Sequence, residues 1–414
     1  MSSNSFDILK INKIEIKGIA IEPSYVTAID IFESLTQPGI TGYINIQDYQ
    51  GLRELGNIFA GDEIKFSFGV QDQSDDLELA FFVYTDEGSS INPLLLYDTL
   101  HLGFCSKWIV DGLTKAVSKP YKDKFIHEII EDIIKTECPD AKIGFIEPTI
   151  QKLEHFLSPR WSPIHTIKYL LSFAMNTEKI GGYIMWTDLK KDQIYVTTVD
   201  YLIKGNLERS DISFNILPGN KRYAGQIISS TFESSYDSIR MINSGLQDTI
   251  FYGFNYDKKK FTTSKDKNTD LKNKRLSKKL PIQTKYKEDK KYAKYKFSPL
   301  FPSTDNSIAG DDTKIDNLVN GSLYNYYTFL TSDLFKINIE TIGETKRRVG
   351  QLVLLEYPSQ NNNTEKSNDD NNQLKTDYLI REIRHSFSSY IDYKQYITLI
   401  IDGYNQHNAE MIQW

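Results

Sequence analysis

The residues of this chain that could hold a metal ion are six histidines and two cysteines, Cys105 and Cys138. His127 and Glu128 begin the H-E-x-x-H pattern with which a helix binds zinc, but the second histidine is missing. His101 and Cys105 lie four positions apart in an expected strand, without further ligands nearby. We therefore expect a packed strand there, with no metal site, no cofactor and no disulfide framework. The histidines are at positions 101, 127, 155, 165, 385 and 407.

Sequence patterns of phosphoryl-transfer and hydrolytic enzymes are also missing. The glycines of I-G-E-T-K-R-R-V-G at 342–350 form no phosphate loop, because G-x-x-x-x-G-K-[ST] does not occur, and neither does a G-x-S-x-G elbow. Carboxylate pairs such as Glu131-Asp132 and Asp311-Asp312 are expected by chance among 55 acidic residues. A glycosidase would need two carboxyls across a cleft, which the sequence alone leaves open. The chain is therefore expected not to be an enzyme.

Aromatic residues make up 13% of the chain, which favours strands and interfaces. Trp108, Trp161 and Trp186 could stack against sugar rings. Buried packing is the commoner role of such side chains, and we expect these three in a core or at a domain interface.

The overall composition indicates a folded protein of two to four domains. Of the 414 residues, 40% are hydrophobic and 25% are charged. The net charge of −6 argues against a dedicated nucleic-acid binder, because phosphate contacts require a positive surface. The first residues contain no apolar signal core, and no stretch approaches the ~20 apolar residues of a membrane span. We expect a soluble protein made in a cytoplasm, without membrane contact.

Residues 11–115 predict β-structure throughout, in an antiparallel barrel or sandwich. The connection 48–61 is unusual because its apolar side chains have no obvious place in the core of that domain. These interface candidates either meet a neighbouring subunit or pack over their own barrel: Tyr49, Leu52, Leu55, Ile58 and Phe59. The expected strands are 10–21, 25–32, 40–46, 62–70, 77–86 and 97–110.

The hydrophobic period changes at residue 118, and the region 118–205 predicts an α+β domain of two helices and a hairpin. The first helix is expected at 122–138, where isoleucines recur at helical spacing. Ser162 and Pro163 are an N-cap and a first-turn proline that begin the second helix. The hairpin follows as Y-I-M-W-T-D and D-Q-I-Y-V-T-T-V, joined by L-K-K.

Strand character returns at 223–233 and 238–243 and again near the C-terminus, with a long polar stretch between. Residues 256–296 hold fifteen Lys and one Arg against five acidic residues. This segment is either a solvated extension, which we favour, or a basic arm that touches an acidic partner or passing DNA. A helix is expected at 316–334, and the Asn-rich segment 359–373 is expected at a hairpin tip.

The fold class expected from these elements is α+β, mainly β, with two similar β-domains, an α+β domain and a Lys-rich insertion. The expected domains are 1–117, the first β-domain; 118–215, the α+β domain; 216–245 with 335–414, the second β-domain; and 246–334, the insertion.

Four stretches, in this order, carry a resemblance to a known family: 25–48, 112–134, 156–174 and the run from I-E-T-I-G-E-T-K-R-R-V-G to I-R-E-I-R-H-S-F at 339–387. Together these stretches span most of the chain and occur in the order typical of the family. The chain resembles the central baseplate hub protein of contractile-tailed bacteriophages, a family related to late control protein D and to the N-terminal part of type VI secretion spike proteins.

The resemblance implies that both β-domains are tail-tube-like antiparallel barrels or sandwiches. It implies a homotrimer whose six β-domains form a ring between a six-fold tail tube and a three-fold spike. The implied partners are the central spike protein below, tail tube or tube-initiator proteins above, and baseplate wedge proteins. DNA would pass the channel without specific binding, and the protein would reside in the virion, in the tail baseplate.

Two other functional classes stay open at this point. One is a tail-associated cell-wall hydrolase, which the missing catalytic motifs disfavour. The other is a receptor-binding adhesin, which usually shows repeats and a long shaft that this sequence lacks.

Overall fold

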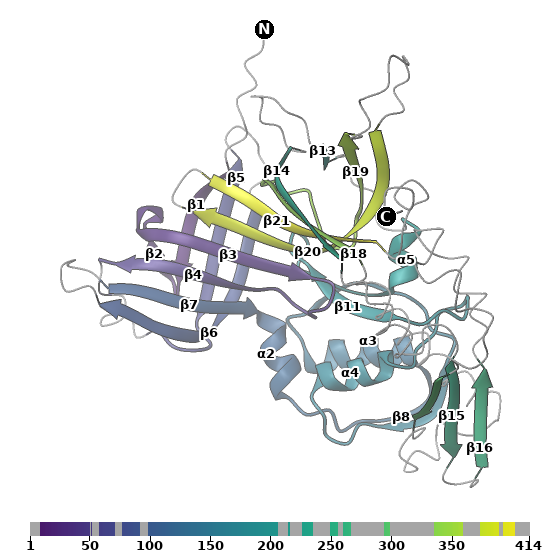
Figure 1. The fold of residues 1–414 in the computed structure, drawn as a ribbon. Coiled ribbons are helices and arrows are strands. Elements are labelled where there is room, and N and C mark those ends of the chain that lie inside the picture. Colours follow the sequence, from purple (N-terminus) through teal and green to yellow (C-terminus); the bar gives the residue numbers. More distant parts are fainter. Residues whose placement is uncertain are drawn as a thin grey trace, which may run out of the picture.

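The computed structural model describes all of residues 98–205 and most strands on either side of them (Figure 1). The helix expected at 316–334 and the strand expected at 238–243 lie outside the described residues, as does the Asn-rich segment except its last residue. The described residues are 9–49, 51, 58–70, 77–91, 98–205, 214–215, 226–234, 249–255, 260–265, 294–298, 335–358, 373–388 and 392–401.

The N-terminal strands form an antiparallel sheet in the order β3-β4-β7-β6-β5-β1-β2. The expected strands are present with two corrections. The strand expected at 10–21 is two strands that turn at Lys17–Gly18 and pair with each other. The strand expected at 97–110 ends at Ser106, and a helix begins at Lys107. This helix forms because Trp108, Ile109 and Gly112 pack inward together. The elements are β1 (Leu9–Ile16), β2 (Ile19–Ile21), a 3-10 turn (Pro23–Tyr25), β3 (Val26–Ser34), β4 (Thr41–Asp48), β5 (Glu63–Val70), β6 (Leu77–Ile91) and β7 (Asp98–Ser106).

The C-terminal strands continue this sheet rather than forming a separate one. Strand β20 pairs antiparallel with β3, so that Arg384 lies opposite Phe32 and His385 opposite Ile31. In Figure 1 the yellow strands β20 and β21 lie beside the purple strand β3. The elements are β13 (Phe214–Asn215), β14 (Ile227–Ser234), β18 (Phe335–Ile342), β19 (Leu352–Pro358), β20 (Gln373–Ser388) and β21 (Asp392–Ile401).

The joined sheet follows one path, β14-β18-β21-β20-β3-β4-β7-β6-β5-β1-β2, whose two ends do not pair among the described strands. The mainly β, α+β class is therefore confirmed, and the described strands form an open sheet in place of closed barrels. The sequence favoured two separate modules because alternation within a strand does not reveal its distant partner strand.

The α+β region packs helices against two small sheets below the large one (Figure 1). The predicted hairpin and the helix that begins at Pro163 are confirmed. The helix expected at 122–138 begins only at Ile126, because residues 120–125 pair as a strand with β10. The elements are α2 (Lys107–Thr114), β8 (Pro120–Phe125), α3 (Ile126–Glu137), β9 (Lys142–Ile146), β10 (Lys152–Leu157), α4 (Pro163–Leu171), β11 (Tyr183–Asp188), β12 (Gln193–Thr198) and α5 (Val199–Ile203).

Three hydrophobic clusters stabilise the described part of the fold, and the β11–β12 hairpin contributes to each of them. Met185 and Ile194 belong to the cluster of the α+β region. Leu189, at the hairpin turn, packs into the cluster under the N-terminal strands, to which β20 contributes Phe387. Trp186 belongs to the cluster under the C-terminal strands. The hairpin is therefore the element on which the three clusters meet, while the domain boundaries at 117, 215 and 245 stay predictions.

Parts of the Lys-rich segment are strand, and whether the segment is a solvated extension or a basic arm stays a prediction. A separate three-stranded sheet contains β15 (Thr249–Asn255), β16 (Lys260–Lys265) and β17 (Lys294–Ser298). Strand β16 and the first three residues of β17 lie inside 256–296. Both strands contain aromatic residues, and β16 also contains Thr, which are residue types that favour strands.

Candidate functional site

The joined sheet has one polar, accessible face, which we name the open face. Side chains alternate along a strand, so Ile29 and Ile31 of β3 point to the core while Asp30 and Phe32 point away from it. A groove of ≈ 590 Å³ follows the open face from β14 to β4 and crosses the contact between β20 and β3. Side chains on the open face include Ser229, Thr231, Asn338, Glu340, Lys394, Tyr396, Thr398, Arg384, Asp30, Phe32 and Tyr43.

The basic side chains at the centre of the open face are paired with carboxylates across the strands. Arg384 donates from Nε and Nη2 to the two carboxylate oxygens of Asp30, at 3.0 and 2.9 Å. The same hydrogen bonds raise the pKa of Arg384 above its ordinary value. Lys394 Nζ lies 3.0 Å from Glu340 Oε1. This face therefore offers polar groups but little unpaired positive charge.

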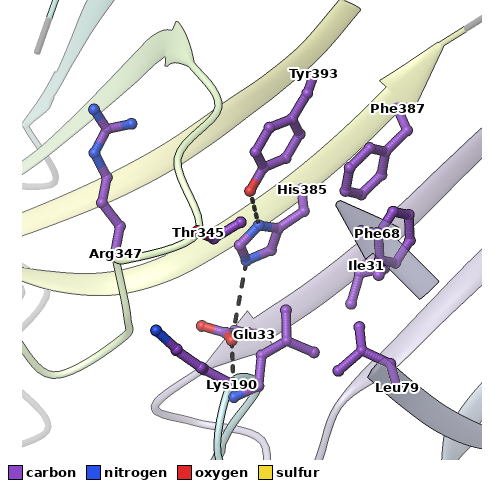
Figure 2. A pocket seen from close by; sticks show the side chains of 11 residues that line it. Ile31, Glu33, Phe68, Leu79, Lys190, Thr345, Arg347, His385, Phe387 and Tyr393 are labelled. Atoms are coloured by element: carbon purple, nitrogen blue, oxygen red, sulfur yellow. Dashed lines mark hydrogen bonds and ion pairs between the residues drawn. The ribbon is translucent and has the colours of Figure 1, made fainter. Parts of the chain in front are cut away.

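A buried polar junction lies under the open face, at the contact between β3 and β20. Glu33 and His385 occupy core-facing positions and are only 2% and 3% exposed. Glu33 Oε1 accepts a hydrogen bond of 3.0 Å from the backbone N–H of Leu189, at the β11–β12 turn. His385 Nε2 lies 4.0 Å from the same oxygen. Figure 2 shows the imidazole between the Glu33 carboxylate and the Tyr393 ring.

Hydrogen bonds extend this junction into β21 and the β18–β19 connection. His385 Nδ1 lies 2.7 Å from the hydroxyl of Tyr393, which accepts a 3.0 Å hydrogen bond from Gln395 Nε2. Arg347 Nη1 donates to Gln395 Oε1 at 2.6 Å, and its Nη2 lies 3.4 Å from Glu344 Oε2. Six side chains from four segments thus form one network, with Glu33 at its end.

Burial shifts the pKa values of Arg347, Glu344 and Tyr393 in this network. It lowers the pKa of Arg347 to about 10, although the nearby Glu344 carboxylate opposes this effect. Burial also raises the pKa of Glu344 and of Tyr393 above their ordinary values. The Arg347 side chain is 0% exposed, so its guanidinium depends on protein partners for hydrogen bonding.

A second polar contact joins the same hairpin to the C-terminal half. Arg348 Nη1 lies 3.1 Å from Asp188 Oδ2 at the end of β11, and the Asp188 side chain is 6% exposed. The turn is therefore held from one side by Glu33 of the N-terminal half and from the other by Arg348 of the C-terminal half.

Chemically, the junction combines a carboxylate, an imidazole and a phenol, which are groups used in acid–base catalysis. Their burial leaves no path for a macromolecular substrate, and their partners belong to the fold itself. We interpret the junction as a structural joint. The sequence analysis missed it, although a signal exists: in I-R-E-I-R-H-S-F, His385 falls on the same strand face as Ile383 and Phe387, and Glu33 likewise follows Ile29 and Ile31.

The interface candidates of the long connection have different environments. Tyr49 is 50% exposed and its ring lies 5.1 Å from that of Tyr25. Phe59 is 62% exposed, while Ile58 is partly buried against the N-terminal cluster. Leu52 and Leu55 lie outside the described residues.

Other residues with chemical potential have ordinary partners. His101 Nδ1 lies 2.8 Å from Asn45 Oδ1, and His127 Nδ1 lies 3.0 Å from Thr149 Oγ1. Within the described ranges, no three His, Cys, Asp or Glu side chains gather to hold a metal ion, and no helix has the length and hydrophobicity to span a membrane. Trp108 and Trp186 are buried, which confirms the expected packing role for both.

Comparisons with known proteins find similarity in structure only. No protein-family model matches the sequence, and no curated protein matches it either. A tail protein from Neisseria meningitidis MC58 has a TM-score of 0.58 at 10% identity, over 95% of this chain and 96% of that one. The 43 kDa tail protein of prophage MuSo2 from Shewanella oneidensis has a TM-score of 0.58 at 11% identity, over 95% and 98%.

An Escherichia coli component of the type VI secretion system, described as structurally similar to tail proteins of bacteriophage T4, has a TM-score of 0.50 at 9% identity. The match covers 95% of this chain and 79% of that one. The expected resemblance is therefore confirmed at the level of the fold: this chain has the fold that phage tail proteins share with a type VI secretion component.

Proposed function

We propose that this chain is a structural hub of a phage tail baseplate, or of a related contractile injection apparatus, that joins a tail tube to a central spike. The observation that carries the proposal is the joined sheet, in which β20 pairs with β3 and extends a polar face across both halves of the chain. Likeness to two tail proteins over nearly their full length supports it.

The hub is a homotrimer in this proposal, because each chain supplies two sheet halves in one continuous surface. Three copies around an axis would present six such halves to a six-fold tail tube and three chains to a three-fold spike. The sheet path ends at β14 on one side and β2 on the other. Ring closure would cover sheet edges that otherwise invite aggregation.

The open face would line the central channel through which DNA passes. Its central cations, Arg384 and Lys394, are already paired with Asp30 and Glu340. A wall of this kind provides few unpaired charges for phosphates, so DNA would slide past without specific binding. The protein would then reside in the virion, in the tail baseplate, with spike, tube or tube-initiator and wedge proteins as partners.

Tyr49 and Phe59 remain interface candidates in this proposal. Both side chains are at least half exposed and lie on either side of the connection 50–57. Aromatic side chains are enriched at the centres of protein interfaces, which supports a contact with a neighbouring copy or with the next ring. Ile58 packs on its own core and is a weaker candidate.

The test is the mass of the purified full-length protein in solution by light scattering, followed by negative-stain imaging. We expect about three times the chain mass of 47.8 kDa and a ring with a central hole. A mixture with the cognate spike protein should keep the ring and add the spike at its centre. A monomer both alone and with the spike would contradict the hub, and peptidoglycan cleavage would favour the hydrolase instead.

A further inference from the structure

Glu33 Oε2 and His385 Nε2 are among the polar atoms of the buried junction that have no hydrogen-bond partner within the described residues. Both side chains are more than nine-tenths buried, and a polar atom buried without a partner is costly. Since such groups are nearly always satisfied in folded proteins, each unsatisfied one points to an unrecognised partner.

The network determines which atoms need this partner. Tyr393 Oη accepts a hydrogen from Gln395 Nε2. We assign its own hydrogen to His385 Nδ1 at 2.7 Å, because the other acceptor, the backbone carbonyl of Glu344, is farther away at 3.4 Å. The imidazole in its neutral form then carries its hydrogen on Nε2 and directs it at the Glu33 carboxylate. The 4.0 Å between Nε2 and Glu33 Oε1 is too long for a direct hydrogen bond.

A cavity with room for one small molecule lies at this position. Its volume is ≈ 10 Å³, and Glu33, His385, Leu189 and Tyr393 are among the residues that line it. That volume is at the lower limit of about 10–15 Å³ that a buried water needs. Two atoms 4.0 Å apart can both lie at about 2.8 Å from a third, which is an ordinary hydrogen-bond length.

We propose that one ordered water molecule occupies this cavity, accepts the Nε2 hydrogen of His385 and donates to the carboxylate of Glu33. The water completes a chain of hydrogen bonds from Arg347 through Gln395, Tyr393 and His385 to Glu33, and from there to the backbone of Leu189. The β11–β12 turn is thereby tied to both halves of the sheet. This solvent site does not depend on the hub proposal.

The first test is a structure of the full-length protein at a resolution that resolves water. We expect a single density peak within about 2.6–3.2 Å of both His385 Nε2 and a Glu33 carboxylate oxygen. A direct bond between the two side chains, or a cavity without density, would overturn the proposal.

The second test counts long-lived internal waters in solution by magnetic relaxation dispersion of water oxygen-17. Glu33→Gln keeps the shape and an acceptor oxygen, and we expect it to retain the wild-type count. Glu33→Leu removes both oxygens, and we expect it to lose one water. His385→Phe removes the Nε2 donor on the other side of the cavity, and we expect this variant to lose one water as well. If a folded Glu33→Leu or His385→Phe variant has as many long-lived internal waters as the wild type, the proposed water site is refuted.

Discussion

At the scale of single residues, the buried junction places charged side chains such as Arg347 and Glu33 at core-facing positions. Arg347 is enclosed by the protein and bonds to Gln395 Oε1 and the carbonyl of Ile342, with Glu344 beside it. Burying an ion pair brings little net stability, but removing one partner leaves the other charge poorly compensated. The junction is therefore sensitive to truncation although it is not a large source of stability.

Arg347→Leu should lower the free energy of unfolding by about 3–5 kcal/mol, because Glu344 and Gln395 lose their buried partner. The measurement is urea unfolding followed by circular dichroism. Lys346→Leu is a matched control, because Lys346 is the residue next to Arg347 and its side chain is exposed. This substitution should change the free energy of unfolding by less than about 0.5 kcal/mol. Adding Glu344→Gln to Arg347→Leu should recover part of the loss. Equal effects of Arg347→Leu and Lys346→Leu would contradict this account.

At the scale of elements, a polar contact joins the N-terminal sheet to the first helix of the α+β region. Lys107, the first residue of α2, pairs with Glu63 at the start of β5. Its ammonium also lies 5.2 Å from the centre of the Phe82 ring in β6. The hydrogen bond from Lys107 lowers the pKa of Glu63, with a further contribution from Lys65.

Because the folded-state pKa of Glu63 is lowered, the contact stabilises the fold above the ordinary Glu pKa of about 4.3 and loses its effect as the pH falls through the lower folded value. Glu63→Gln should therefore cost up to about 1 kcal/mol at pH 7, as expected for a partly exposed pair. The difference from wild type should vanish in strong acid. Unfolding curves at several pH values measure it, and a difference independent of pH would contradict this assignment.

At the scale of the whole molecule, assembly and the channel are the properties to test. Phe59→Ser combined with Tyr49→Ser should reduce the trimeric fraction in light scattering while leaving the unfolding midpoint nearly unchanged. Leu113→Ser on α2 is a matched control, because that apolar side chain is 58% exposed and lies on a different element. If both variants change assembly equally, these aromatic residues are not the interface.

The channel should not retain DNA. In a gel-shift experiment at physiological salt, the assembled protein should leave linear duplex DNA unshifted. Asp30→Asn with Glu340→Gln removes the partners of Arg384 and Lys394 and should produce measurable, salt-sensitive retention. Retention by the wild type that disappears when the lysines of 256–296 are replaced by Gln would assign the DNA contact to the Lys-rich segment instead.

The sequence by itself determined the local elements. Alternation predicted most N-terminal strands and the β11–β12 hairpin, and the Ser162–Pro163 signal predicted the start of α4. These signals are reliable because strand and helix periods involve residues a few positions apart. The same signals failed at 107–114 and 120–125, where pairing and packing with distant elements changed the local outcome.

Only the tertiary structure decided that the two halves share one sheet, and therefore where the open face and the junction lie. Asp30 and Arg384 are 354 positions apart in the chain but share a two-bond ion pair. Alternation shows which side of each strand is buried, and it places Glu33 and His385 on such sides. It does not show which strand lies next, because that choice depends on burial and hydrogen bonding summed over the whole sheet.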